Sequence, residues 1–231
     1  MEIRDVKIFA DNRWQEYKAS ITDISKSGNC NGSLVQSTEV IYSFDQICQF
    51  LFSNDRCPSS ADGLAFTKKA LLLIEFKSGF KQNITKDNYD PDKAKCEYSG
   101  EPCPYYYQLF RENRKLKREE LIHSIRLKAI ESVVTLEKHV FPCCCKDFRE
   151  KRIPINFIVV IDGYFTEGIE DILATLAKSP CPGENVYNSI KQALSRLMGN
   201  QDYNRNIYYY DKIEVMSCAE FYNFLDSHQI V

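Results

Sequence analysis

The sequence contains no apolar run long enough to cross a membrane, and its first residues, MEIRDVKIFADNRW, carry charges where a secretory signal has an apolar segment. We therefore expect a cytoplasmic protein that makes no contact with membranes. Thiols stay reduced in that compartment, so the ten cysteines are expected to be free. The tight C-x-x-C spacing of common zinc and iron–sulfur sites is missing, which argues against a metal held by thiolates.

Several catalytic motifs are also missing. The chain has no glycine-rich phosphate loop, no G-x-S-x-G and no H-E-x-x-H. Its three histidines are scattered and predict neither a catalytic triad nor a zinc site. These absences argue against nucleotide hydrolysis on a P-loop, against an α/β-hydrolase and against a zinc protease.

The chain has no excess of basic residues. Its 30 Lys and Arg stand against 32 Asp and Glu, so the net charge is −2 and any binding of nucleic acid has to come from a local patch. Charged residues make up 27% of the chain and hydrophobic ones 44%, which is typical of a folded protein. A length of 231 residues suits one α/β domain, 1–231, with an additional lobe.

The most informative segment is ADGLAFTKKALLLIEFKSG, residues 61–79. It predicts two short strands joined by a polar turn at 67–69. The run from Ala70 to Ile74 is continuously apolar, which is typical of a strand buried on both faces. This hairpin is the element around which we expect the rest of the domain to be built.

Three charged residues interrupt these apolar strands. Asp62 lies at the start of the first strand, and Glu75 and Lys77 lie at the end of the second. Residues two apart on a strand point to the same face, so Glu75 and Lys77 should lie together, and strand pairing would bring Asp62 close to Glu75. Two carboxylates beside one ammonium form a candidate site for a divalent cation such as Mg²⁺.

This pattern resembles the PD-(D/E)xK, or restriction-endonuclease-like, nuclease superfamily: Asp62, twelve residues, and then Glu75-Phe76-Lys77. Ala61 stands where the family usually has proline. The resemblance implies an α/β fold with a mixed central β-sheet flanked by helices. Its core, built as helix, three strands, helix and strand, would cover about 39–162, with an irregular insertion at 80–114 and an α/β extension of further strands and helices at 163–231.

The resemblance also implies a mechanism. Asp62, Glu75 and the main-chain carbonyl of Phe76 would bind Mg²⁺ or Mn²⁺, and Lys77 would position the attacking water. The substrate would be a phosphodiester bond in DNA, with RNA as the second choice. In this family the helix before the catalytic strands can bring another acid, for which Glu39 and Asp45 are the candidates by position.

Two other interpretations stay open. Glu75 and Lys77 could form a surface pair on an edge strand, with Asp62-Gly63 as turn residues. Alternatively, the scaffold could be a binding module that has lost turnover and recognises nucleic acid or a protein partner.

Hydrophobic periodicity predicts the remaining elements. Strands are expected at 2–9, 34–42, 155–161 and 212–216. Helices are expected at 43–54, 115–140, 168–177, 186–198 and 219–225. Ser43 and Gln46 fit a capping box, and Pro142 should end the long helix. Only two strands are clear between the first two of these helices, so either 34–42 supplies the third strand of the core or the helix at 43 is misplaced.

The long helix and the segment before it supply the candidate contacts to nucleic acid. Its start, RENRKLKRE, is the densest basic run in the chain, and the tyrosines before it could stack on unpaired bases. The residues are Tyr105, Tyr106, Arg114, Lys115, Lys117, Arg118 and Arg126. In the resembling family this helix often offers a basic or amide side chain to the catalytic site, and the available ones are His123, Arg126 and Lys128.

Overall fold

A six-stranded mixed sheet forms the centre of the protein. The structure, a computed structural model, describes residues 2–26, 32–52, 56–78, 104–144, 153–162, 182–198, 209–228 and 230. The strands are β1 (Lys18–Ser20), β2 (Val40–Ser43), β3 (Gly63–Phe66), β4 (Leu71–Lys77), β5 (Ile155–Ile161) and β6 (Lys212–Ser217), and they pair in sequence order. Strands β1 to β4 pair antiparallel with one another in succession, whereas β5 pairs parallel to β4 and β6 parallel to β5. The predicted mixed central sheet is confirmed.

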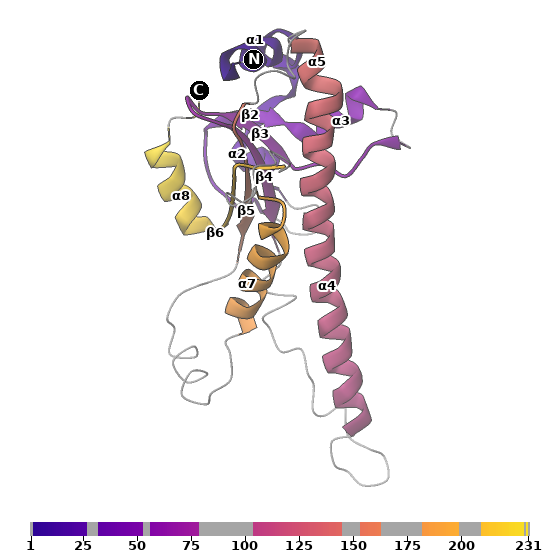
Figure 1. Ribbon diagram of the computed structural model, residues 1–231. Coiled ribbons are helices and arrows are strands. Elements are labelled where there is room, and N and C mark those ends of the chain that lie inside the picture. Colours follow the sequence, from indigo (N-terminus) through magenta and orange to yellow (C-terminus); the bar gives the residue numbers. More distant parts are fainter. Residues whose placement is uncertain are drawn as a thin grey trace.

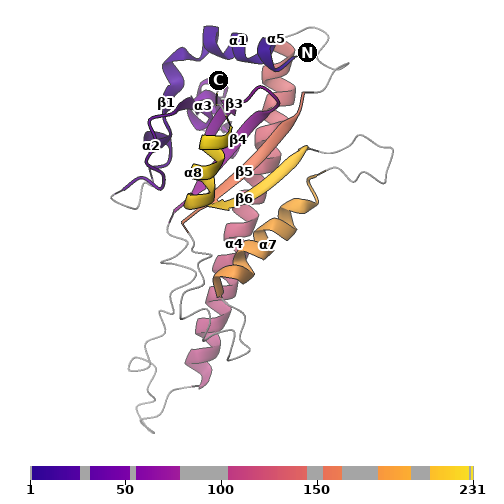
Figure 2. The same ribbon diagram turned by 90° about the vertical axis from the view of Figure 1, so that its left-hand side faces the viewer.

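Helices cover both faces of this sheet (Figures 1 and 2). They are α1 (Ile3–Arg13), α2 (Ile21–Ile24), α3 (Phe44–Leu51), α4 (Pro104–Thr135), α5 (Phe141–Cys144), α7 (Pro182–Ser195) and α8 (Cys218–Ser227). Side chains of α1, α3, α4 and α7 pack with Leu71 and Leu73 of β4 in one core. Leu72 and Ile74 point to the opposite face, into a second core with α2 and α8. This double coverage explains the continuous apolar run of β4.

The amino-terminal prediction was wrong. Residues 2–9 were expected to form a strand, but α1 occupies Ile3–Arg13. Val6 and Ala10, four residues apart, are buried on one helical face. Asp5 and Glu2 form a capping box at the start of the helix. The short alternation of apolar and charged residues fitted a strand, and packing on the core decides for the helix.

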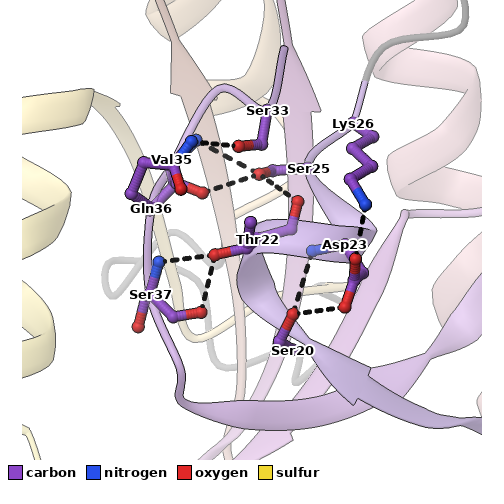
Figure 3. Close-up of polar contacts among 9 residues, drawn as sticks. All are labelled: Ser20, Thr22, Asp23, Ser25, Lys26, Ser33, Val35, Gln36 and Ser37. Atoms are coloured by element: carbon purple, nitrogen blue, oxygen red, sulfur yellow. Dashed lines mark hydrogen bonds and ion pairs between the residues drawn. The ribbon is translucent and has the colours of Figure 1, made fainter.

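The second predicted strand is shorter than expected. The strand was expected at 34–42, but β2 covers only Val40–Ser43. The residues before it wrap around α2, where Ser25 Oγ accepts a hydrogen bond from the Val35 N–H at 3.1 Å (Figure 3). α3 follows directly, with Ser43 at its N-cap position, but the Ser43 side chain makes no capping hydrogen bond. The predicted capping box is therefore wrong.

The long helix differs from its prediction at both ends. It starts at Pro104, so 104–114, expected to be irregular, is helical; the part of the predicted insertion at 80–103 lies outside the described residues. At the other end, a π-helical turn at Leu136–Val140 leads into α5. Pro142 thus falls in the first turn of a new helical segment, where its missing N–H costs little, and it does not end the helix.

The carboxyl-terminal elements agree with the sequence. β5 and β6 lie where strands were expected, and α8 covers the last predicted helix. α7 begins four residues earlier than expected, at Pro182, and ends at Ser195. The helix predicted at 168–177 lies outside the described residues. Among the described helices, none combines the length and apolar character that a membrane span requires.

Candidate functional site

The β3–β4 hairpin places Asp62 and Glu75 opposite each other. Gly63 pairs with Ile74 in the antiparallel register, so the next residue on each strand is Asp62 on one side and Glu75 on the other. The turn of the hairpin is held by Thr67, whose Oγ1 accepts a hydrogen bond from the Ala70 N–H at 3.0 Å. Both acids therefore lie at the end of the hairpin that is away from the turn.

Strand alternation directs Glu75 and Lys77 to the face that α4 covers. Leu71 and Leu73 point into the core beneath α4, and Glu75 and Lys77 continue the same row of side chains. Phe76 points to the other face, where it packs in the second core. Glu75 and Lys77 therefore share one face of the strand, as expected. The Glu75 side chain is completely buried.

Lys128 of α4 joins the two acids. Its Nζ donates to Asp62 Oδ1 at 2.9 Å and to Glu75 Oε2 at 2.9 Å. The other oxygen of Asp62, Oδ2, accepts a hydrogen bond from the main-chain N–H of Phe76 at 2.7 Å. In a strand the N–H and C=O of one residue point to the same side, so the Phe76 carbonyl faces the side on which Asp62 lies.

Lys77 contacts the remaining oxygen of Glu75. Its Nζ lies 2.9 Å from Glu75 Oε1. Apart from this ion pair, the buried Oε1 has no hydrogen-bond partner among the residues that the structure describes. A buried carboxylate oxygen with unused acceptor capacity is a suitable partner for a cation or a bound water.

Burial and neighbouring charge perturb the pKa values at this site. Burial, with the charge of Asp62 as the second cause, raises the pKa of Glu75 to about 7 against the opposing influence of the two lysines. Burial disfavours the Lys128 ammonium, but the charges of Glu75 and Asp62 together outweigh it and raise the pKa of Lys128. The lysine therefore stays charged, while Glu75 can gain or lose a proton near neutral pH.

Asp45 lies beside this group and Glu39 does not. Asp45, in the first turn of α3, accepts a hydrogen bond from the Ser60 hydroxyl, and burial raises its pKa. Glu39 is exposed ahead of β2 and lines a different pocket, which lies against α8. Of the two acids suggested by position, only Asp45 belongs to the site.

An open cleft of about 500 Å³ borders Asp45, Asp62, Lys77 and Lys128, and the fully buried Glu75 lies behind them. These four side chains form one wall. Another wall is formed by α2 and the two residues after it, including Asp23, Ser25 and Lys26. Hydrogen bonds from Ser20 and Lys26 to Asp23 and from Ser25 to the following loop brace this wall (Figure 3).

None of the seven predicted contacts to nucleic acid is among the described residues that line this cleft. Tyr105, Lys115 and Lys117 are exposed near the start of α4, which extends well beyond the sheet (Figure 1). At 1.5 Å per residue, Lys115 is roughly 20 Å from Lys128 along the helix axis. Arg118 is half-buried and Arg126 is exposed; the side chains of Tyr106 and Arg114 lie outside the described residues.

Sequence reasoning named Lys128 only as one of three basic candidates on the helix. The structure leaves His123 and Arg126 exposed and brings Lys128 to the acids. The available signal was its spacing, because Lys128 follows the buried Ile125 by three residues. Ser132 was missed: its Oγ accepts a hydrogen bond from the Ala61 N–H at 2.8 Å and ties the residue before Asp62 to α4.

The oxygen atoms of this site can be compared with the ligands that a divalent ion requires. Within the described part of the chain, no three His, Cys, Asp or Glu side chains are arranged to hold a metal. Mg²⁺, however, is commonly held by one or two carboxylates and keeps several waters. Asp62, Glu75 and the Phe76 carbonyl fit that mode of binding, with Lys128 Nζ now on one oxygen of each acid.

Comparison of the chain with protein-family models, curated proteins and solved structures finds no match. Function has to be argued from the chemistry of this site.

Proposed function

We propose that the protein is a metal-dependent nuclease that hydrolyses phosphodiester bonds in nucleic acid, DNA in preference to RNA. The observation that carries the proposal is the convergence of Asp62 and Glu75 on a single cation at the ends of adjoining strands. Lys77 forms an ion pair with Glu75, and Asp62, Lys77 and Lys128 line an open cleft.

The order of elements supports a restriction-endonuclease-like core. α1, β2, β3, β4, α4 and β5 follow the order of helix, three strands, helix and strand, with β1 and α2 added between α1 and β2 and α3 added between β2 and β3. The helix α1 lies before the core expected at 39–162. The acids lie at β3 and β4, the second and third strands of that series. The assignment of the segment 34–42 as the third strand is supported by β2, which precedes α3 in the chain and pairs with β3 in the sheet.

Each side chain has a role in this proposal. A divalent ion would supply a water of lowered pKa and would stabilise charge on the phosphate. Asp62, oriented by the Phe76 N–H, and Glu75 would hold that ion. Lys77 would orient the attacking water and neutralise charge that develops on the phosphate. The cleft leaves room for a phosphodiester beside these groups.

The test is cleavage of single- and double-stranded DNA and RNA by purified protein with Mg²⁺ or Mn²⁺. We expect the wild-type protein to cleave at least one of these substrates, and the variants Asp62→Asn and Lys77→Ala to be inactive. Lys212→Ala serves as the matched control, because Lys212 pairs with Glu214 on an exposed part of β6. If the wild-type protein cuts none of these substrates with either ion, the proposal fails.

A binding module without turnover is the second candidate, and one observation favours it. Lys128 already forms ion pairs with both carboxylates, as it would in a purely structural ion-pair network. Calorimetric titration with Mn²⁺ separates the two candidates. A nuclease requires binding that Asp62→Ala and Glu75→Ala abolish, whereas a module for nucleic acid or a protein partner requires none.

A further inference from the structure

The position between the two carboxylates is held by the ammonium of Lys128. Asp62 Oδ1 and Glu75 Oε2 are each 2.9 Å from Nζ, so a single point charge satisfies one oxygen of each acid. The Lys128 side chain comes from α4, and its ammonium is mostly shielded from water. Geometrically, the lysine does what a small cation would do between the same two groups.

Two like charges in a buried position need such a cation. Glu75 is fully buried and Asp62 is mostly buried, so neither carboxylate is well solvated. Their mutual repulsion is strong where the dielectric constant is low. Removing the Lys128 charge would leave the pair with Lys77 alone, which reaches only Glu75 Oε1.

A divalent ion at the usual 2.0–2.1 Å from these oxygens could not share the position with the ammonium. Both cations would need Asp62 Oδ1 and Glu75 Oε2, and the two positive charges would repel each other. Metal binding and the Lys128 contacts therefore compete for the same acceptors.

The displaced ammonium has a destination. Lys128 also borders a second open cleft of about 480 Å³, which Asp45 and Ser60 line as well. The Asp45 carboxylate accepts a hydrogen bond from Ser60 there. The positive charge of Lys128 already favours the ionised form of Asp45 against the opposing effect of burial. A change of side-chain rotamer could thus exchange one acidic partner for another.

We propose that Lys128 is a tethered cation that holds Asp62 and Glu75 together until a divalent ion displaces it toward Asp45. The inference rests on the proposed nuclease function, because it concerns the same metal site. It predicts that the lysine weakens metal binding while keeping the acids in place for it. Lys128 is in this sense a positioning residue and not a ligand.

Chemical labelling tests the displacement on the wild-type protein. Lysines are acetylated with an N-hydroxysuccinimide ester, with and without saturating Mn²⁺, and rates are read by mass spectrometry. We expect Lys128 to react at least about five times faster with Mn²⁺ present, because its two ion pairs are released. The exposed Lys212 is the internal control and should keep its rate.

Calorimetry with Mn²⁺ alone provides the second arm. Lys128→Met should bind Mn²⁺ at least about tenfold more tightly than wild type, while Lys128→Arg should not. Lys18→Met is the matched control, since Lys18 forms a comparable ion pair with Asp11 away from this site. The labelling arm does not depend on Lys128→Met folding.

The outcomes separate the two ideas. If Mn²⁺ binds wild type but the labelling rate of Lys128 is unchanged, the displacement is wrong and the nuclease proposal stands. Equal or weaker binding by a folded Lys128→Met also overturns it. If Mn²⁺ binds neither wild type nor Lys128→Met, both proposals fail together.

Discussion

Two lysine–carboxylate clusters in this protein use the same residue types and have opposite properties. At Asp11, one acid is shared by Lys7, Lys18 and the Tyr42 hydroxyl, at 2.9, 2.6 and 2.6 Å. At Glu75, two acids share Lys128, and Lys77 contacts Glu75 alone. The first cluster has an excess of donors for one carboxylate, and the second has two carboxylates in competition.

The pKa shifts follow from this difference. Burial would raise the pKa of Asp11, but hydrogen bonds from Lys18, Tyr42 and Lys7 outweigh it and hold that pKa well below its usual value. Complete burial and the charge of Asp62 raise the pKa of Glu75 to about 7. A perturbed acid in a cleft is a functional candidate, whereas a satisfied acid near the surface is a structural one.

The largest expected difference between the clusters is in activity. Glu75→Gln should lower the rate of phosphodiester cleavage at least about 100-fold, because it removes a charged metal ligand and the partner of Lys77. Asp11→Asn should leave the rate within about twofold. The cleavage rates of both variants are measured on the same DNA substrate. Equal losses of rate would show that the Glu75 cluster has no special role in catalysis.

The next difference is in stability. Lys128→Met should lower the free energy of unfolding by about 3 kcal/mol, because it leaves two buried carboxylates without their shared cation. Lys18→Met should cost about 1 kcal/mol or less, because Asp11 keeps Lys7 and Tyr42 as partners. Urea unfolding at pH 8, where Glu75 is ionised, measures both; similar costs would contradict the assigned roles.

The clusters should also respond to pH in opposite directions. The folded-state pKa of Glu75, about 7, lies above its ordinary 4.5, so its contribution to stability is fully present below pH 4.5 and is lost as the pH rises through 7. The folded-state pKa of Asp11 is depressed below 3.8, so its contribution is present above pH 3.8 and is lost as the pH falls.

Denaturant unfolding at a series of pH values tests these signs. In a plot of the free energy of unfolding against pH, Glu75→Gln should flatten the curve between pH 4.5 and 7 and leave the part below pH 3.8 unchanged. Asp11→Asn should do the reverse, flattening the limb below pH 3.8. A Glu75→Gln curve that keeps the wild-type slope near neutrality would show that Glu75 does not titrate there.

The smallest expected effect concerns one hydrogen bond. Tyr42→Phe removes one of the three donors to Asp11 and should cost about 1 kcal/mol in the free energy of unfolding. In the Asp11→Asn background the cost should be smaller, because the charge of the acceptor is gone. A double-mutant cycle by urea unfolding measures this coupling; additive costs would mean that the Tyr42 hydroxyl contributes independently of the Asp11 charge.

Local patterns located some elements of the fold and misassigned others. The β3–β4 hairpin and β5 follow from continuous apolar runs, because strands buried on both faces need them. α1 was mistaken for a strand because EIRDVKIF fits both periodicities over eight residues. The start of α4 was missed because tyrosines and a proline before the basic run are typical of irregular segments.

The amino-acid sequence by itself determined which acids could meet, because Asp62 and Glu75 belong to one hairpin whose register follows from neighbouring residues. Tertiary structure decided which cation they meet. Lys128 lies 53 residues beyond Glu75, and its approach depends on how α4 docks on the sheet, where Ser132 holds Ala61. Docking of a distant helix is set by the packing of the whole core, and no local pattern in the chain encodes it.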